Sequence, residues 1–534
     1  MQGEDKVAAR PELIFALVGA AGIDLDNLSA ELALHLKIYG YDVVEIRLSS
    51  LLPTFTGWMS QTGATEADRI THLQNIGNSF RSRLADGAAL ARAGIASIRA
   101  ERTKRSGSPD QAAGALAYIV RQLKHPAEVD LLREVYGPSF LLVAGHAPQE
   151  MRVETLTRRL ARGESQRLEF FKSKAQDIIL ADDKQDDDYG QNTRDAYPKA
   201  DFFLNCGIPY GEQEIGRFVE LLFGHPFRTP SPEEYAMYQA STVSLRSSDD
   251  NRQVGAAIVS LTRDESGEIT NADVMALGMN EVPRAGGGFY WDKDSPDRRD
   301  QALLRVGNED RAEDIKISAL TELIERLVQR GWFLKEIADQ RAGDLARQLL
   351  PNLRRTQFMD IGEFSRPVHA EMAALIDAAR RGVAVDNHSM YVTTFPCHNC
   401  AKHIIAAGIR RVVYMEPYPK SRADRLYGEE LELKSGTGME EEGKVVFCAF
   451  SGVAPRQYRQ LFALSERAAG RGKRLKQWEA ERQTLVPLCV SRNAQVAYLT
   501  AERQELEKLP VDVYPWDKQA ICSVIDSSEG LAER

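Results

Sequence analysis

Residues 369–416 have the sequence HAEMAALIDAARRGVAVDNHSMYVTTFPCHNCAKHIIAAGIRRVVYME. Apolar residues recur at helical spacing over 369–381 and again over 397–407, which predicts two helices. The runs 390–395 and 410–416 are short and apolar, with β-branched and aromatic residues, which predicts two buried strands. Helices that alternate with buried strands are typical of an α/β domain, so this stretch decides the fold class of the region around it.

The same kind of pattern continues upstream of this stretch. It predicts one helix and two strands, over 233–244, 254–261 and 274–279. The triple glycine Gly286-Gly287-Gly288 then interrupts it, and the charged, amphipathic run 312–350 predicts a helical insertion. After residue 421 the sequence is polar and mixed. We expect the insertion to span about 289–366 and a C-terminal extension to span about 421–534.

The N-terminal region alternates short apolar runs with longer amphipathic ones. The apolar runs predict strands over 13–19, 41–48, 116–120, 140–144 and 201–205. Helical stretches between the strands imply a doubly wound, parallel sheet. The segment Arg228-Thr229-Pro230-Ser231-Pro232 then marks a break in the chain. We therefore expect two α/β domains, over 1–228 and 229–534.

Composition narrows the class of protein. No stretch approaches the roughly 20 apolar residues of a membrane span, so we expect no membrane partner. The net charge of −9 disfavours sequence-independent coating of nucleic acid. Only two of the six cysteines lie close in sequence, which fits a reducing cytoplasm and one metal site better than a disulfide framework.

The strongest functional signal combines one imidazole, two thiols and a carboxylate. It consists of His369-Ala370-Glu371 and Pro396-Cys397-His398-Asn399-Cys400. Three protein ligands of this kind suit Zn²⁺ and leave a fourth position open for water. Glu371, two residues after a ligand, is placed to move protons without binding the metal. This H-x-E and P-C-x-x-C arrangement is the signature of zinc-dependent nucleobase deaminases.

The alternative is a closed, structural zinc site with a fourth protein ligand. His398, His403 and Cys448 are the candidates for that ligand. His398 lies between the two thiols and is expected to point away from their shared helix face. Nothing in the sequence brings Cys448 close.

Neighbouring segments occur in the order found in a known family. With the zinc segments, Arg252-Gln253-Val254-Gly255 and Gly278-Met279-Asn280-Glu281-Val282-Pro283 resemble the deoxycytidylate deaminase branch of the cytidine deaminase superfamily. The resemblance implies a three-layer α/β/α domain in which Asn280 contacts the sugar of the substrate. The alternative role for Asn280 is ordinary turn chemistry, since asparagine is favoured in turns.

The whole chain is similar to the bacterial anti-phage dCTP deaminases, which join a P-loop-kinase-like domain to a deoxycytidylate deaminase domain. Segments that carry this resemblance include Leu17-Val18-Gly19-Ala20-Ala21-Gly22, Glu416-Pro417-Tyr418-Pro419-Lys420-Ser421 and Gly452-Val453-Ala454-Pro455-Arg456. It implies conversion of dCTP, and of dCMP, to the deoxyuridine nucleotide, which depletes dCTP during phage infection. It also implies a homo-oligomer, and an antagonist RNA as the partner of some members.

Phosphate groups on such a substrate need cations. Lys420 and Arg422 follow the last strand of the motif region, and Arg246 and Arg252 flank the strand expected over 254–261. Most lysines and arginines are instead solvated surface charges. Tyr418 is a candidate to stack near the base, with ordinary packing as the alternative.

The N-terminal loop departs from a working phosphate-binding loop. Gly19-Ala20-Ala21-Gly22-Ile23-Asp24 follows a strand and precedes a helix, but Asp24 stands where the second glycine of GxxxxGK[S/T] belongs. The lysine and the hydroxyl residue are also missing, which disfavours phosphoryl transfer. Two interpretations remain, a regulatory nucleotide held by backbone amides near Gly19 and Gly22, or a tight turn without ligand.

Two charged runs have a simple expected role. Asp182, Asp183 and Asp186–Asp188 predict a solvated acidic loop, with Mg²⁺ binding as the alternative. Arg99, Arg102, Lys104 and Arg105 predict an exposed basic helix end, with RNA or phosphate binding as the alternative.

Three functions follow from these observations. The first is deamination of free deoxycytidine nucleotides. The second is a cytosine or adenosine deaminase that acts on polynucleotides, which usually needs a basic groove that the net charge does not support. The third is a switch in which nucleotide or RNA at the N-terminal domain controls the deaminase.

Overall fold

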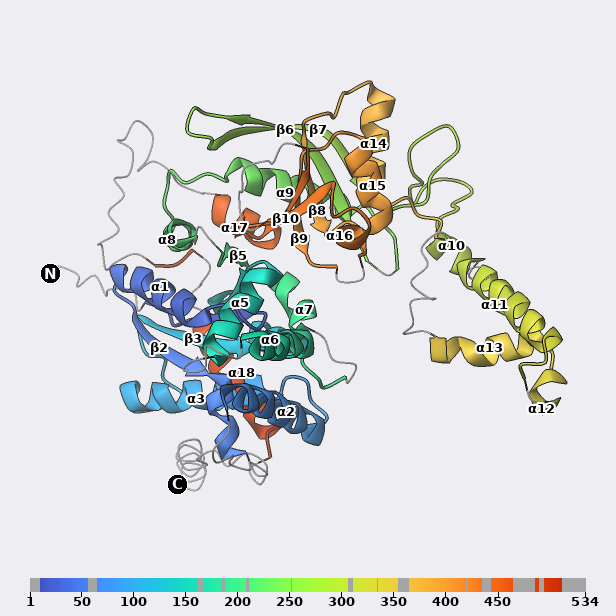
Figure 1. The fold of residues 1–534 in the computed structure, drawn as a ribbon. Helices are drawn as coiled ribbons and strands as arrows, with labels where there is room; N and C mark the ends of the chain where they lie inside the picture. The colour runs from blue at the N-terminus through green and yellow to red at the C-terminus, as the bar shows by residue number, and fades with distance from the viewer. Residues whose placement is uncertain are drawn as a thin grey trace.

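The computed structural model describes residues 10–55, 65–161, 168–183, 188–207, 211–250, 252–305, 311–333, 335–353, 365–418, 421–434, 443–463, 486–488 and 494–510. These residues form two six-stranded sheets (Figure 1). Around both sheets, helices alternate with strands along the chain, as the sequence predicts. In the described part of the chain, no helix is long and apolar enough to cross a membrane.

The first sheet has the strand order β12-β5-β4-β1-β3-β2. Five of its strands are parallel: β1 (Leu13–Gly19), β2 (Asp42–Arg47), β3 (Leu116–Leu123), β4 (Phe140–His146) and β5 (Phe202–Asn205). All seven residues of β1 are buried, because helices cover both faces of the sheet. Leu13, Phe15 and Leu17 face one core, while Ile14, Ala16 and Val18 face the other.

The helices of this region divide between the two faces. On one face lie α1 (Leu25–Ile38) and α8 (Glu212–Leu222). On the other lie α3 (Ala89–Ser106) and α4 (Pro126–Tyr136). A separate cluster joins α2 (Glu66–Leu84), α5 (Gln149–Leu160) and α6 (Leu168–Asp183), and Ala21 of the loop after β1 packs against it. The short helix α7 (Thr193–Ala196) precedes β5.

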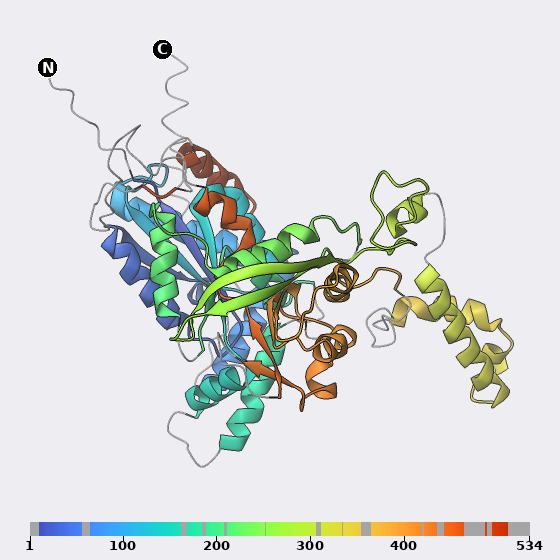
Figure 2. The same ribbon diagram turned by 90° about the horizontal axis from the view of Figure 1, so that it is seen from above.

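The second sheet has the order β10-β11-β9-β8-β6-β7. Its strands are β6 (Gly255–Arg263), β7 (Ile269–Met279), β8 (Ser389–Thr394), β9 (Arg411–Glu416), β10 (Leu431–Lys434) and β11 (Val445–Ala449). The strand β6 is antiparallel to both neighbours, whereas β8, β9, β11 and β10 are parallel. Helix α9 (Pro232–Ser244) covers one face, and α14 (Ala370–Arg381) and α15 (His398–Ala406) cover the other (Figure 2). This is a three-layer α/β/α arrangement, and the short helix α16 (Ala423–Leu426) follows β9.

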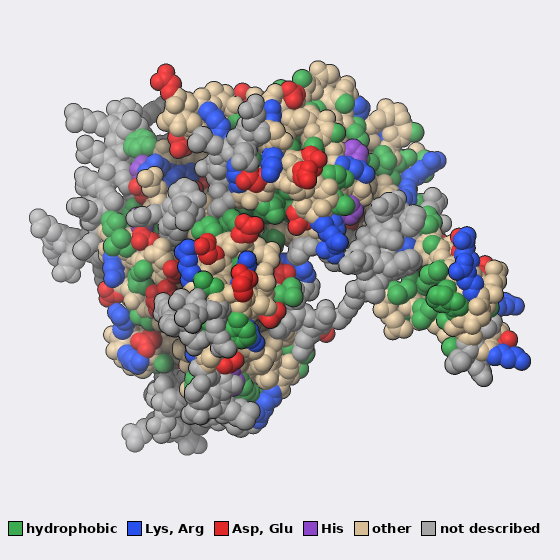
Figure 3. Space-filling model, in the orientation of Figure 1, with side chains coloured by type: hydrophobic (Ala, Val, Ile, Leu, Met, Phe, Trp, Pro, Cys, Tyr) green, Lys and Arg blue, Asp and Glu red, His purple; other side chains and the backbone are tan. Residues whose placement is uncertain are grey.

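The predicted helical insertion forms an arm beside the second sheet. It contains α10 (Asp300–Arg305), α11 (Arg311–Gln329), α12 (Lys335–Ala338) and α13 (Ala342–Leu353). The arm projects away from both sheets (Figures 1 and 2). Its own small core includes Leu320, Ile324 and Ala346, and hydrophobic side chains also gather on its surface (Figure 3).

Part of the C-terminal extension packs on the N-terminal sheet. The strand β12 (Gly452–Val453) pairs antiparallel with β5, and α17 (Tyr458–Phe462) contacts α8. Helix α18 (Ala494–Glu507) contacts α3 and α4. Residues that follow the second sheet in sequence therefore complete the first one.

This packing corrects the expectation of an exposed basic helix end. Arg99 is 1% exposed and Arg102 is 0% exposed. Arg102 lies between two buried carboxylates, 2.9 Å from Glu12 and 2.6 Å from Glu502 of α18. A buried guanidinium requires such partners, and helix periodicity alone could not reveal a partner some 400 residues away. Lys104, by contrast, is exposed as predicted.

The expectation of a solvated acidic loop is likewise wrong for Asp182. This residue is 1% exposed and bonds Lys124 at 2.8 Å. Asp186 and Asp187 lie outside the described residues.

Candidate metal centre and active site

His369 is held at the start of α14 by a short strand pairing. Val368 donates a backbone hydrogen bond to Glu281 at 3.0 Å and accepts one at 3.3 Å. His369 is the N-cap residue of α14, in extended conformation. The helix then places Glu371 in its first turn, where the carboxyl is 4% exposed. The turn after β7 thus positions the imidazole, and helix geometry positions the acid.

The two thiols come from the start of α15, which follows β8. Cys397 is the N-cap residue, and Cys400 lies in the first turn. The Pro396 carbonyl accepts a hydrogen bond from the Ser421 hydroxyl at 2.8 Å, which fixes the entry to the helix. This agrees with the predicted placement of both thiols on one face at a helix start.

The three side chains meet in one group. The Nδ1 atom of His369 lies 3.4 Å from Cys397 Sγ and 3.3 Å from Cys400 Sγ. A tetrahedral zinc ion with ordinary Zn–S and Zn–N bonds separates such atoms by about 3.6 Å. All three ligand atoms lie within 4.8 Å of one another. The donor set and its spacing therefore fit zinc.

No fourth protein ligand joins this group among the described residues. His403 Nδ1 contacts the Asn399 carbonyl of its own helix at 2.6 Å. Cys448 is buried in β11, where its thiol is 3.8 Å from the Val412 carbonyl. Two of the candidate fourth ligands are thus engaged elsewhere, which favours an open position over a closed structural site.

The thiols, the imidazole and the carboxyl of this group shift one another's pKa values. A hydrogen bond from Cys400 lowers the pKa of the Cys397 thiol to about 4, and that sulfur in turn raises the pKa of His369 to about 9. Burial raises the pKa of Glu371 to about 7, and the nearby Cys397 sulfur acts in the same direction. A carboxyl whose pKa lies near neutrality can both accept and donate a proton.

Residues 247–250 and 252–254 form a strap close to the metal group, where Asp249 helps to raise the pKa of His369. The Asn280 side chain holds it, because its Oδ1 accepts from Val254 N at 2.7 Å and its Nδ2 donates to the Arg252 carbonyl at 2.8 Å. Glu281 supports the other end by accepting from Ser248 N and Oγ at 3.0 and 2.8 Å. In this structure the amide of Asn280 therefore binds the strap, and its contact with a substrate sugar stays a prediction.

The candidate phosphate ligands separate into different places. Arg252 is half exposed and lies 3.2 Å from Glu416 at the end of β9. Thr394, three residues before Cys397, also contacts Glu416, at 3.4 Å. Arg252 therefore lies close to the cysteine segment. Tyr418 follows β9, and Lys420 lies outside the described residues.

Arg246 belongs to a separate cavity. Its guanidinium stacks on the Trp291 ring at 3.6 Å and donates to the Phe289 carbonyl at 3.2 Å. Arg284 and Arg380 line the same cavity. His369, Cys397 and Cys400 do not line it, and a phosphate-binding role for Arg246 stays a prediction.

Gly19 and Gly22 lie away from both groups described above. Gly19 is the last residue of β1 in the first sheet, and Gly22 lies in the loop that follows it. They line a cavity with Arg121 and Lys124. Gly22 has a φ of +90°, and a Cβ atom there would lie 2.4 Å from the Arg152 carbonyl oxygen. Only glycine fits this close approach of loop and helix.

Two carboxylates near the site, one buried and one partly buried, were missed by the sequence analysis. Glu281 is 2% exposed, and burial raises the pKa of Glu416. Glu281 lies within the Asn-x-x-Pro turn and Glu416 at the end of a predicted strand. An acidic residue in that turn or at that strand end was the sequence signal that could have identified these two carboxylates.

Comparison with known proteins agrees with this geometry. The family model for the cytidine and deoxycytidylate deaminase zinc-binding region matches residues 230–416. The match supports a deaminase domain here. The zinc-binding character of that family and the His-Cys-Cys group support Zn²⁺ as the cofactor of this domain.

The sequence similarity to known proteins is confined to short segments of this chain. The chain is 46% identical over 55 residues to the deoxycytidylate deaminase of Enterobacteria phage T2, which is 10% of this chain and 29% of that protein. It is 39% identical over 77 residues to ComE operon protein 2 of Bacillus subtilis, which is 14% of this chain and 39% of that protein. The chain thus spans well under half the length of these relatives.

Among solved structures, the dCMP deaminase of cyanophage S-TIM5 in apo form is similar at 17% identity. The alignment covers 41% of this chain and 99% of that one, with a TM-score of 0.21. A TM-score this low supports no conclusion about the fold or the function of this chain.

Proposed function

We propose that this protein is a zinc-dependent hydrolytic deaminase of deoxycytidine nucleotides. The observation that carries the proposal is the group of His369, Cys397 and Cys400 with the buried carboxyl of Glu371 beside it. Hydrolytic deamination adds water to C4 of cytosine and releases ammonia, which leaves uracil. A bound zinc ion supplies Lewis acidity toward the attacking water.

The remaining chemistry belongs to the chain itself. Glu371 takes a proton from the attacking water and passes it to the ring nitrogen as the C4–O bond forms. It then takes the proton of the new C4 hydroxyl and passes it to the amino group, which leaves as ammonia while the C4 carbonyl forms. Its burial suits this role, because a pKa of about 7 lets one carboxyl serve in both directions. The strap held by Asn280 and Glu281 forms the neighbouring wall, and Arg252 is the candidate cation for a substrate phosphate.

The substrate class rests on the relatives. The deoxycytidylate deaminases of phages T2 and T4 are each 46% identical to this chain over 55 residues, which supports dCMP-type nucleotides. Conversion of dCTP, with depletion of dCTP as an anti-phage defence, rests on the family resemblance of the whole sequence. The same holds for a homo-oligomer and an antagonist RNA, whereas a cytoplasmic location rests on the cysteine pattern.

The test is a substrate panel with zinc-loaded protein. We would incubate it with dCTP, dCMP, CTP, CMP, cytidine and a cytosine-containing single strand, and follow ammonia and uracil together. Turnover confined to deoxycytidine nucleotides supports the proposal and fixes the preferred phosphate number. Turnover of the single strand alone would instead identify a polynucleotide deaminase, and Glu371→Ala serves as the inactive control.

A further inference from the structure

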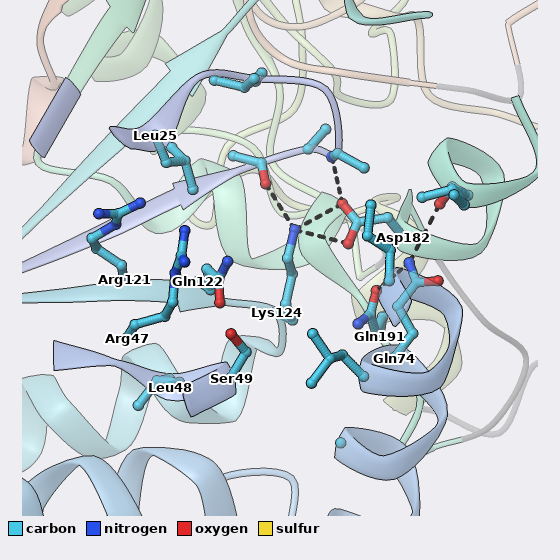
Figure 4. A pocket seen from close by; sticks show the side chains of 18 of the residues that line it. Leu25, Arg47, Leu48, Ser49, Gln74, Arg121, Gln122, Lys124, Asp182 and Gln191 are labelled. Atoms are coloured by element: carbon cyan, nitrogen blue, oxygen red, sulfur yellow. Dashed lines mark hydrogen bonds and ion pairs between the residues drawn. The ribbon is translucent and has the colours of Figure 1, made fainter. Parts of the chain in front are cut away.

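The cavity lined by Gly19 and Gly22 lies at the carboxyl ends of β1, β2 and β3 (Figure 4). Its volume is about 1050 Å³, including space open to solvent. Strand β1 lies between β3 and β4, so the chain crosses from one side of it to the other. In open parallel sheets, ligands bind at the carboxyl ends of the strands near such a reversal. None of the residues proposed for deamination lines this cavity.

Four arginines from four different elements line one part of the cavity. Arg47 and Arg121 both bond Asp26, and Arg121 also bonds Glu45 at 2.8 Å. The other two, Arg69 and Arg159, share Glu66, each at 2.7 Å. Four guanidinium groups thus face three carboxylates, and the excess is positive. Planar guanidinium groups suit a phosphate, which they can bind with paired hydrogen bonds.

Several polar atoms at this end have no partner within the described protein. The Nε atoms of Arg47 and Arg121 are buried without a hydrogen bond, as is Oε1 of Gln122. Arg121 is only 5% exposed. A buried polar atom without a partner costs free energy, so a ligand that supplies the partners would relieve this cost.

Gln122 is held toward the cavity by an irregular backbone. Strand β1 pairs Leu17 with Arg121 and Val18 with Leu123, so Gln122 is passed over in the ladder. Its φ is 70°, which is unusual for a residue other than glycine. The side chain lies beside Arg47 and Arg121 (Figure 4). Strain of this kind is concentrated at ligand sites.

Carboxylates already occupy some of the backbone amides in the loop after β1 and at the start of α1. Asp182 accepts from Ala21 N at 2.7 Å and is held by Lys124 at 2.8 Å. Asp24 accepts from the backbone of Asp26 and Asn27, at 3.1 and 3.0 Å, and so caps α1. Two carboxylates therefore occupy the donors that a second or third phosphate would need, and room remains for one phosphate at the arginines.

The other side of the cavity carries amide groups. Gln74 and Gln191 are 7% and 6% exposed, and Gln74 Nε2 lies 3.3 Å from Gln191 Oε1. In Figure 4 both lie near Asp182, on the opposite side of Lys124 from Arg47 and Arg121. Apolar residues such as Leu73 and Leu156 line the space as well. Amides with apolar neighbours match the edge and face of a heteroaromatic base.

We propose that this cavity binds a nucleoside monophosphate, with its phosphate at the four arginines and its base toward Gln74 and Gln191. The site is separate from the proposed deaminase centre, and its existence does not depend on that activity.

Direct binding to the full-length, zinc-loaded protein tests the proposal. Calorimetry would use dGMP, dAMP and dTMP, which are not cytosine substrates, with the matching nucleosides, triphosphates and inorganic phosphate as comparisons. At least one monophosphate is expected to bind at least tenfold more tightly than its nucleoside and than phosphate, and no more weakly than its triphosphate. Absence of binding by all three monophosphates overturns the proposal, as does a clear preference for the triphosphate.

Neighbouring arginines on α5 locate the site. Arg159 lines the cavity, whereas Arg158 does not line it, pairs with Glu154 and is 75% exposed. Arg159→Ala is expected to weaken monophosphate binding about tenfold or more, since a charge-assisted contact is lost. Arg158→Ala is expected to leave it unchanged.

Equal effects of the two variants, or unaltered binding in Arg159→Ala and in Arg47→Ala, would place the ligand elsewhere and overturn the proposal. Both cavity arginines are at least 40% exposed, so their removal should not prevent folding. Because no turnover is measured, a failed deaminase assay leaves this result intact.

Discussion

Glu371 carries the proposed proton transfers and is not one of the three residues whose ligand atoms form the metal group. Glu371→Gln should therefore retain zinc and thermal stability while kcat falls by about 10²–10⁴-fold, the usual contribution of general acid–base catalysis. Zinc content by atomic spectroscopy, measured beside kcat, checks this. Loss of zinc together with activity would make Glu371 a ligand and would refute the mechanism.

Among single residues, the sequence best predicted those whose side chains the metal chemistry requires. The metal group assembled as its spacing predicted, because a helix start brings residues three apart onto one face. Arg246 lay in another cavity, and Arg102 was buried, because a cation's surroundings depend on partners distant in sequence. Spacing cannot reveal such partners.

Helices and strands were predicted well where the apolar pattern was strong. The strand predicted over 274–279 extends from Ile269, because its first half alternates exposed and buried positions at the edge of the second sheet. The parallel sheet at the N-terminus followed the buried runs closely. The pairing of β12 with β5 could not be predicted, since two residues carry no periodic signal.

Close packing of α14 on β7 gives a prediction at the element scale. A Cβ atom at Gly278 would lie 2.2 Å from Ala374 N and 2.3 Å from the Ala370 carbonyl. Gly278→Ala should force α14 outward and destabilise the protein by about 1–3 kcal/mol, as overpacking does. Thermal melting would measure this.

Gly343→Ala on α13 is the matched control. Its Cβ would meet nothing closer than 3.9 Å, so the change should be neutral or stabilising. If both variants melt alike, the contact between helix and strand is not tight in solution.

At the scale of the whole molecule, the first and last parts of the chain share a buried ion network. Arg102 bonds Glu12 before β1 and Glu502 on α18. Glu502→Ala should lower the free energy of unfolding by about 1.5–3 kcal/mol, because Arg102 keeps Glu12 but loses its charged hydrogen bonds to Glu502. Differential scanning calorimetry would detect this, and Arg105→Ala, at a 40% exposed pair with Asp42, should change little.

The stability of the protein should depend on pH through a histidine at the contact between the two sheets. His146 of the first sheet lies near Tyr414 of the second, and burial lowers its pKa to about 4. In the unfolded chain the pKa is about 6.5. Between these values the unfolded state binds a proton that the folded state does not, so stability falls as pH drops from about 6.5 toward 4. His146→Phe should flatten this part of the stability profile, and an unchanged slope would contradict the assignment.

The placement of α18 has a consequence for how the protein is made. During synthesis, Arg99 and Arg102 leave the ribosome some 400 residues before their partner Glu502. The first sheet also awaits β12, so the N-terminal part cannot reach its final state until the rest has been translated. A nascent chain stalled before residue 494 would lack α18, so Arg99 and Arg102 would be left without the carboxylate of Glu502.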